Sequence, residues 1–201
     1  MTPSSRNRRS IRLPRYDYTQ PGAYFITICT YQFVHLFGTV VNGKMEINEY
    51  GRIVEAEWHK SPQMRPYLRM DEFVVMPNHS HGIIWITNPE LSKAKTLVQP
   101  EFRLKSRSLG AFVGGFKAAV TKQINLLRNA PSAMPVWHRN YYEHIIRRDE
   151  SLNAIRQYIR ENPARWQIDR YHPTSAGPDP LAIEIWQMLR DEEVSDNGEY
   201  L

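Results

Sequence analysis

The sequence predicts an α+β fold built on an antiparallel sheet, and three observations support this prediction. Short runs rich in β-branched and aromatic residues alternate with longer stretches of helical periodicity. Tight-turn dipeptides join several of the expected strands, and Asn42-Gly43 is the clearest of them. Hairpins pair neighbouring strands in opposite directions, whereas parallel strands need long crossovers, so we favour an antiparallel sheet.

The expected strands share a high content of β-branched and aromatic residues. The first, residues 24–30 (YFITICT), is apolar enough to be buried on both faces. The others are residues 36–41 and 44–47 around the Asn42-Gly43 turn, two strands within residues 70–86 joined at Pro77-Asn78, and residues 141–146.

The expected helices show apolar residues at three- to four-residue spacing. They cover residues from Glu49 to the prolines at 62 and 66, residues 108–128, residues 149–162 and a short segment at 181–189, after which the tail shows no pattern. Pro163 ends the third of them. Gly114 and Gly115 would each weaken the second by about 1 kcal/mol relative to Ala, which suggests close backbone packing or a hinge there.

The charge is unevenly distributed along the 201 residues. The whole chain has 26 basic and 21 acidic residues, a net charge of +5. Residues 179–201 hold seven of the acids and one base, so 25 bases and 14 acids remain in residues 1–178, a net charge of +11. A basic body of this kind favours a polyanionic partner, with nucleic acid as the first candidate. A basic soluble enzyme with a solubilising tail is the alternative.

Composition excludes several other classes of protein. Cys29 is the single cysteine, so the chain has neither an intramolecular disulfide framework nor a multi-thiolate zinc site. No apolar run approaches the roughly 18–20 residues that span a membrane, and the basic N-terminus lacks the apolar stretch of a signal peptide. We therefore expect a soluble cytoplasmic protein without a membrane partner.

The first candidate site is His79-Ser80-His81. Residues i and i+2 of a strand project from the same face, so both imidazoles can converge on one divalent ion while Ser80 points away. Apolar strand sequence flanks the pair on both sides, and Gly82 is expected to leave open space beside the second histidine. Two ordinary surface or half-buried histidines are the alternative.

The second candidate site is Tyr158 with Asn162. A spacing of four places the phenol and the carboxamide on one helical face, one turn apart. The Asn162 carbonyl oxygen can complete a site for a hard cation, and a nearby cation would favour the phenolate form of Tyr158. A packed tyrosine and a polar residue at the end of the helix are the alternative.

Three segments carry a resemblance to a known family: MPNHSHGIIWI, LGAFVGGFKAAVTKQIN and YYEHIIRRDESLNAIRQYIRENPARW. Together they resemble the REP-associated tyrosine transposases, relatives of the single-tyrosine insertion-sequence transposases in the HUH endonuclease superfamily. The similarity runs from about residue 16 to residue 166. It implies an HUH tyrosine transposase domain at residues 16–170. The charge pattern indicates a basic flexible arm before it, at residues 1–15, and a C-terminal extension with the acidic tail after it, at residues 171–201.

The resemblance also implies a fold and a reaction. The fold is a ferredoxin- or RRM-like antiparallel sheet of four or five strands with helices mainly on one face. By position, His79 and His81 match the family's metal-binding histidines, Asn162 its helix-borne third ligand and Tyr158 its nucleophile. The residue between the histidines is usually bulky and hydrophobic, and here it is Ser80. The implied reaction is Mg²⁺- or Mn²⁺-dependent cleavage and rejoining of single-stranded, hairpin-forming repeat DNA through a 5′-phosphotyrosine.

Several basic residues are candidates for contacts with the DNA backbone, although a solvated basic surface is almost as good an interpretation of each. They are Arg8, Arg9 and Arg12 in the arm, and Lys117, Lys122, Arg147, Arg148 and Arg165 in the body. Two other functions stay open: a non-catalytic nucleic-acid-binding protein, and a metal hydrolase that activates water. A monomer and a homodimer are both compatible with the sequence, as is association with the nucleoid.

Overall fold

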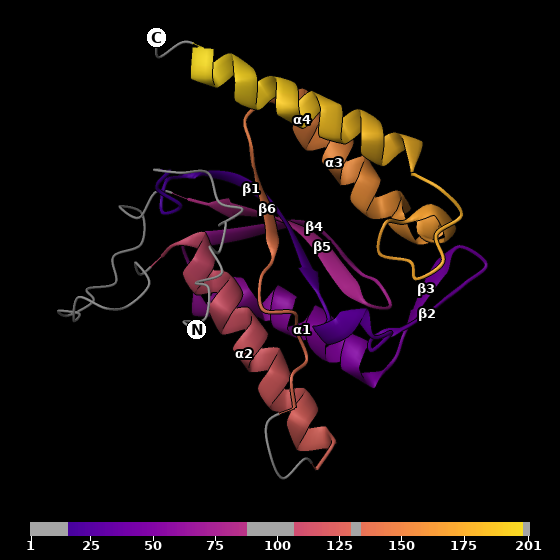
Figure 1. Cartoon of the computed structure of the whole chain (residues 1–201). Helices are drawn as coiled ribbons and strands as arrows, with labels where there is room; N and C mark the ends of the chain where they lie inside the picture. Colours follow the sequence, from indigo (N-terminus) through magenta and orange to yellow (C-terminus); the bar gives the residue numbers. More distant parts are fainter. Residues whose placement is uncertain (1–15, 88–106, 130–133, 199–201) are drawn as a thin grey trace, which may run out of the picture.

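The structure, a computed structural model, describes residues 16–87, 107–129 and 134–198, and of residues 193–198 it describes the backbone alone. One antiparallel sheet has the strand order β4-β5-β1-β6. Its strands are β1 (Gly22–Cys29), β4 (Leu68–Val75), β5 (His79–Ile86) and β6 (Tyr142–Ile146). The prediction of an α+β fold on an antiparallel sheet of four strands is confirmed (Figure 1).

The predicted Asn-Gly hairpin forms a separate two-stranded sheet from β2 (Gly38–Val41) and β3 (Lys44–Ile47). Asn42 and Gly43 both have positive φ, 50° and 72°. Two residues of this conformation make the tight turn that matches the twist of a hairpin, and Asn and Gly are the residues that adopt it most readily.

Helices cover both faces of the four-stranded sheet, rather than mainly one as expected (Figure 1). Helices α1 (Glu49–Met64) and α2 (Leu109–Leu127) pack on one face, and α3 (Asp149–Glu161) and α4 (Pro180–Gly198) on the other. The physical reason is the apolar character of β1 on both sides. Tyr24 and Ile26 face the first pair of helices, and Phe25 faces the second.

Helix α1 ends at Met64, between the two prolines that were expected to end it. Helix α4 ends later than the sequence predicts. Helix α4 continues to Gly198, well beyond residue 189. Ile185 and Leu189 of α4 are buried against α3, so tertiary packing stabilises a helix whose sequence pattern is weak.

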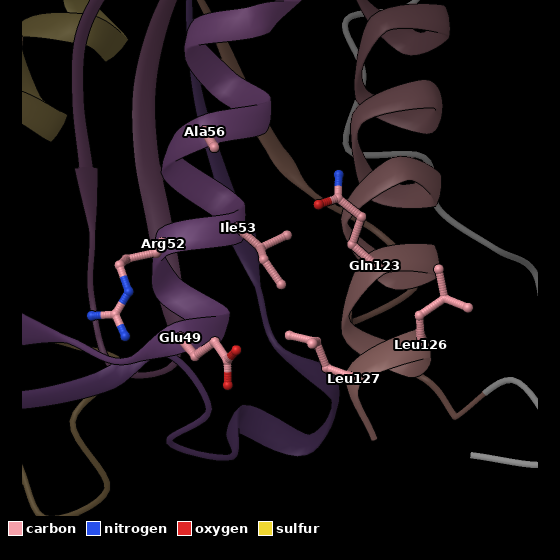
Figure 2. Close-up of a pocket in the computed structure, with 7 residues that line it drawn as sticks. All are labelled: Glu49, Arg52, Ile53, Ala56, Gln123, Leu126 and Leu127. Atoms are coloured by element: carbon pink, nitrogen blue, oxygen red, sulfur yellow. The ribbon is translucent and has the colours of Figure 1, made fainter. Parts of the chain in front are cut away.

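The glycine pair in α2 is not a site of close backbone packing. A Cβ at Gly114 would meet no atom within 4 Å, and one at Gly115 would meet the Arg65 guanidinium, the end of a flexible side chain. Further along the helix, an open groove of about 470 Å³ separates α2 from α1 (Figure 2). Its lining includes Ile53 of α1 and Leu126 and Leu127 of α2.

No helix within the described part of the chain is both long and apolar enough to cross a membrane.

Candidate metal and nucleophile site

His79 and His81 lie at the start of β5, on the face of the sheet that α3 covers. Both side chains are buried, and their Nε2 atoms are 3.0 Å apart. Strand alternation turns Ser80 to the opposite face, as the sequence predicts. The two imidazoles therefore converge on one point.

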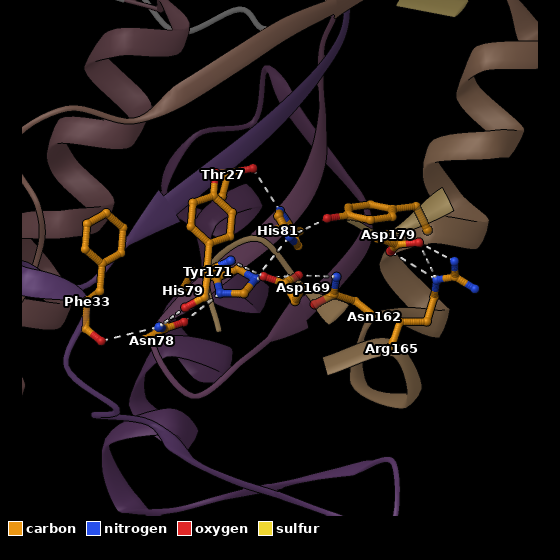
Figure 3. A network of polar contacts seen from close by, with 11 residues as sticks. Thr27, Phe33, Asn78, His79, His81, Asn162, Arg165, Asp169, Tyr171 and Asp179 are labelled. Carbon is orange, nitrogen blue, oxygen red and sulfur yellow. Dashed lines mark hydrogen bonds and ion pairs between the residues drawn. The ribbon is translucent and has the colours of Figure 1, made fainter. Parts of the chain in front are cut away.

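A fixed partner sets the tautomer of His79. Its Nδ1 lies 2.9 Å from Oδ1 of Asn78, and the Asn78 amide donates to the backbone carbonyls of Phe33 and Tyr171. Because both Asn78 donors are in use, its Oδ1 accepts from the His79 ring, and the lone pair of His79 is on Nε2 (Figure 3).

His81 has an equivalent partner in Thr27 of β1. The Thr27 hydroxyl lies 2.8 Å from Nδ1 of His81 and accepts a hydrogen bond when that nitrogen is protonated. The lone pairs of the two rings then face each other across 3.0 Å, an arrangement that a cation between them would stabilise.

Both imidazoles are neutral at physiological pH. Burial lowers the pKa of His79 to about 3, and Asn162 has a smaller opposing effect. Burial, and then the neighbouring His79, lower the pKa of His81 well below its ordinary value. Metal ligation requires neutral imidazole, so burial keeps both rings ready to bind an ion.

Tyr158 extends from the last turn of α3 towards this pair. Its hydroxyl is 3.5 Å from Nε2 of His81, and its ring also packs against Phe25. Burial, followed by the charge of Asp169, raises the pKa of Tyr158 well above the ordinary value for a phenol. The buried hydroxyl is therefore protonated at neutral pH.

Asn162 lies one turn after Tyr158, where α3 passes into the 3₁₀ helix η3 (Asn162–Ile168). Pro163, which lacks a backbone N–H, marks this change of helix type. The Asn162 amide donates to Oδ2 of Asp169 over 3.0 Å. Its carbonyl oxygen Oδ1 is buried and has no hydrogen-bond partner among the described residues.

The sequence analysis did not identify Asp169, which is buried at the centre of the site. Its Oδ2 is 4.0 Å from Nε2 of His79, and the ligand atoms of His79, His81 and Asp169 all lie within 4.8 Å of one another. Oδ1 accepts from the backbone N–H of Tyr171 at 2.6 Å. Only the proximity of Asp169 to Asn162 in the sequence could have pointed to it.

Tyr171 is a second tyrosine beside the histidines. Its ring centroid is 4.7 Å from that of His79 and 6.2 Å from that of His81. Tyr171 is thus nearer to His79, whereas Tyr158 contacts His81. The sequence pattern had pointed only to Tyr158.

Gly82 does not leave open space beside His81. A Cβ at Gly82 would lie 2.3 Å from Cη2 of Trp58 and 3.0 Å from the Phe73 ring. The reason is strand alternation, which turns residue 82 to the face opposite His81, where the α1 indole fills the space.

A protein of Haemophilus influenzae (strain ATCC 51907 / DSM 11121 / KW20 / Rd), itself uncharacterised, is 41% identical to this chain over 172 residues. The match covers 83% of this chain and 93% of that protein. The chain belongs to the family of this Haemophilus protein. No family model matches the sequence.

Two solved structures are similar to this protein. One is a REP-associated tyrosine transposase bound to a REP hairpin, with TM-score 0.47, 18% identity, and coverage of 78% of this chain and 74% of that one. The other is a candidate transposase from Deinococcus radiodurans R1, with TM-score 0.43, 14% identity, and coverage of 74% and 95%. The first is a member of the family that the sequence motifs resemble.

The basic residues that the sequence offered as contacts for the DNA backbone lie on separate elements of the chain. Arg8, Arg9 and Arg12 lie outside the described residues. Lys117 donates to the carbonyls of His138 and Arg139, and Arg165 binds the carboxylate of Asp179 through Nε at 3.0 and 3.1 Å. Lys122 is exposed on α2, and Arg148 is exposed just before α3. Arg147, next to it, is half-buried.

Proposed function

We propose that the protein is a metal-dependent tyrosine transposase or endonuclease that cleaves and rejoins single-stranded, hairpin-forming repeat DNA. The observation that carries this proposal is the convergence of the Tyr158 hydroxyl, two neutral imidazoles and the Asn162–Asp169 pair at one buried point. The motif resemblance to the REP-associated tyrosine transposases supports the same function.

The donor set fits Mg²⁺ or Mn²⁺. His79 and His81 offer nitrogen ligands whose other ring nitrogens are held by Asn78 and Thr27, as in many metal sites. Asp169 offers a carboxylate and Asn162 a carbonyl oxygen with no other partner, which is the kind of ligand that hard cations prefer. When bound, the ion would polarise the scissile phosphate and favour ionisation of a nearby phenol.

Tyr158 is the proposed nucleophile. Its oxygen forms a bond to phosphorus as the bond from phosphorus to the 3′-oxygen breaks, and the phenol loses a proton while the departing 3′-oxygen gains one. The product is a 5′-phosphotyrosine and a free 3′-hydroxyl. Attack by another 3′-hydroxyl reverses the step and joins strands without an external energy source, because one phosphodiester replaces another.

The DNA backbone is proposed to follow the basic part of the chain, which carries a net charge of +11 over residues 1–178. Proposed contacts are the arm residues Arg8, Arg9 and Arg12, with Lys117, Lys122, Arg147, Arg148 and Arg165 in the body. Arg165 contributes only if DNA displaces Asp179 from it. A non-catalytic DNA-binding protein is the alternative that the same charge favours.

The test is covalent capture of DNA. The wild-type chain, incubated with labelled single-stranded hairpins and Mn²⁺, should give a protein–DNA band on a denaturing gel. Tyr158→Phe should lose both this band and the nicked product while keeping its affinity for the hairpin, because one hydroxyl is removed. Tyr171→Phe is the matched control and should retain both products.

Each alternative function gives a different result. A water-activating hydrolase would nick DNA as Tyr158→Phe, without ever forming the covalent band. A non-catalytic binder would leave every hairpin intact, even as wild type with Mg²⁺ or Mn²⁺. Loss of the band in Tyr171→Phe but not in Tyr158→Phe would show that Tyr171, and not Tyr158, is the nucleophile.

A further inference from the structure

A second cavity lies beside the candidate site, between β6 and α4. It has a volume of about 290 Å³. Its lining consists of two guanidinium groups, two large aromatic rings, a histidine and a leucine, with no carboxylate: Arg170, Arg190, Tyr142, Trp186, His144 and Leu189. Aromatic rings that can stack a base, next to cations that can bind a phosphate, are the combination that holds unpaired nucleotides.

The strand register places this cavity level with the metal-binding histidines. Thr27 of β1 is paired with His81 on one side and with Tyr142 on the other, so these three residues form one row across the sheet. Two strand spacings separate the outer members of the row, a distance of about 10 Å. A single strand of nucleic acid can therefore occupy both places at once.

The Phe25 ring packs between the candidate site and two of the side chains that line the cavity. On one side its centroid is 5.5 Å from His81 and 6.4 Å from Tyr158. On the other it is 6.2 Å from Tyr142 and 6.1 Å from Trp186. The two aromatic rings that line the cavity and the ring of Tyr158 thus pack against the same side chain.

Arg170 connects the cavity to the candidate site. It follows Asp169 directly in the chain and is exposed at the cavity. Its guanidinium carbon lies 5.4 Å from the centroid of the Tyr171 ring, and that ring lies 4.7 Å from the His79 ring. Arg170 therefore adjoins both the cavity and the residues around the histidines.

We propose that this cavity binds one unpaired nucleotide of the DNA strand next to the phosphate that Tyr158 attacks. The base lies against Trp186 and Tyr142, whose rings meet edge to face at 5.0 Å, and the neighbouring phosphates contact Arg170 and Arg190. The inference rests on the proposed function for the identity of the strand. It assigns to α4 the selection of the nucleotide beside the cleavage point.

The first measurement is the salt dependence of DNA binding. Fluorescence anisotropy with a short labelled oligothymidylate, in EDTA and in a Tyr158→Phe background, separates binding from metal and from cleavage. Arg170→Gln with Arg190→Gln should lower the slope of log K against log salt by about 1.4, the value for two single-strand phosphate contacts. The control, Arg52→Gln with Lys60→Gln on the exposed side of α1, removes the same charge from the opposite face of the sheet and should leave the slope unchanged.

The second measurement identifies the base. Abasic nucleotides are placed at successive positions beside a hairpin, and one position should weaken binding about fivefold or more in the same background. Trp186→Ala should cause a similar loss with intact DNA, and the two changes together should cost no more than either alone. Circular dichroism checks the fold of Trp186→Ala, and the exposed arginine pair supplies an independent result if that variant unfolds.

The outcomes separate the cavity from the proposed function. Two results together would overturn the nucleotide site, even if the wild type cleaves DNA. The first is an equal salt-dependence slope for the two double variants, and the second is that the losses of affinity from Trp186→Ala and from an abasic nucleotide add up at every position. Coupling at one position without any cleavage by the wild type would support the nucleotide site and refute the transposase function.

Discussion

The Tyr158 hydroxyl lies 3.5 Å from Nε2 of His81, although 77 residues separate them in the sequence. Neither α3 nor β5 alone contains the site. Helix α3 packs across the sheet through Ile155 and Ile159, on either side of Tyr158, and this packing brings the phenol to the imidazoles. The chemistry of the site therefore depends on the core beneath it.

Removing the two imidazoles should abolish cleavage without removing DNA binding. In His79→Ala with His81→Ala, we expect no Mn²⁺-dependent nicking, whereas hairpin affinity should change less than about threefold because phosphate contacts supply much of it. Titration calorimetry should show loss of Mn²⁺ binding. His59→Ala, an exposed histidine on α1, is the control and should behave as wild type. Nicking at the normal rate by the double variant would exclude the proposed metal site.

The Thr27 hydroxyl should support metal binding through His81. Thr27→Val removes the group that holds Nδ1 of His81 at 2.8 Å while nearly keeping the side-chain shape. Loss of such a partner typically lowers metal affinity by about 10- to 100-fold. Thr39→Val on β2, where the threonine is exposed, should leave Mn²⁺ affinity unchanged. Equal Mn²⁺ affinities of both variants in calorimetry would show that Thr27 does not orient the ring.

Local periodicity predicts the parts of the site that lie on one element. A period of two places His79 and His81 on one strand face, and a spacing of four places Tyr158 and Asn162 on one helix face. Asp169 escapes such patterns because it reaches the site through the return of the chain after η3, which no local repeat encodes. The sequence identified candidate ligands from β5 and α3 but not the carboxylate between them.

The placement of the helices shows a similar limit to what the sequence predicts. The apolar run in β1 correctly predicts a strand buried on both faces. It does not say which helices cover which face, because that depends on contacts between distant elements. Gly82 is an example: strand alternation shows that it lies on the face opposite His81, but the Trp58 ring that fills the space there comes from α1.

Two ion pairs at a β-bulge in β4 hold α3 to the edge of the sheet. The β4–β5 register shifts between Met70 and Phe73, and the bulge presents Asp71 to Arg156 and Glu72 to Arg160. Hydrogen bonds from Arg156, and then from Trp85, lower the pKa of Asp71 to about 2. A folded-state pKa below the unfolded value means that this carboxylate stabilises the fold above about pH 4, and that the contribution disappears as the pH falls towards 2.

Asp71→Asn should therefore lower the free energy of unfolding at pH 7 by about 1–2 kcal/mol, after allowance for partial exposure. The difference from wild type should shrink between pH 4 and pH 2, as measured by urea denaturation across that range. Glu72→Gln removes the more exposed ion pair and should cost less than about 0.5 kcal/mol. A loss in Asp71→Asn that is the same at pH 2 and pH 7 would mean that the carboxylate charge is not its cause.

Two glycine-to-alanine substitutions should have opposite effects on stability. At Gly82 the added Cβ would lie 2.3 Å from the buried Trp58 ring, and overpacking of this kind costs about 1–3 kcal/mol. At Gly114, exposed within α2, the Cβ meets nothing within 4 Å, so the higher helix propensity of alanine should add about 0.5–1 kcal/mol. Urea denaturation of both variants measures the difference directly. A destabilised Gly114→Ala variant would show that α2 needs a flexible backbone at this position. An unchanged stability of Gly82→Ala would show that the Trp58 ring can move away from β5.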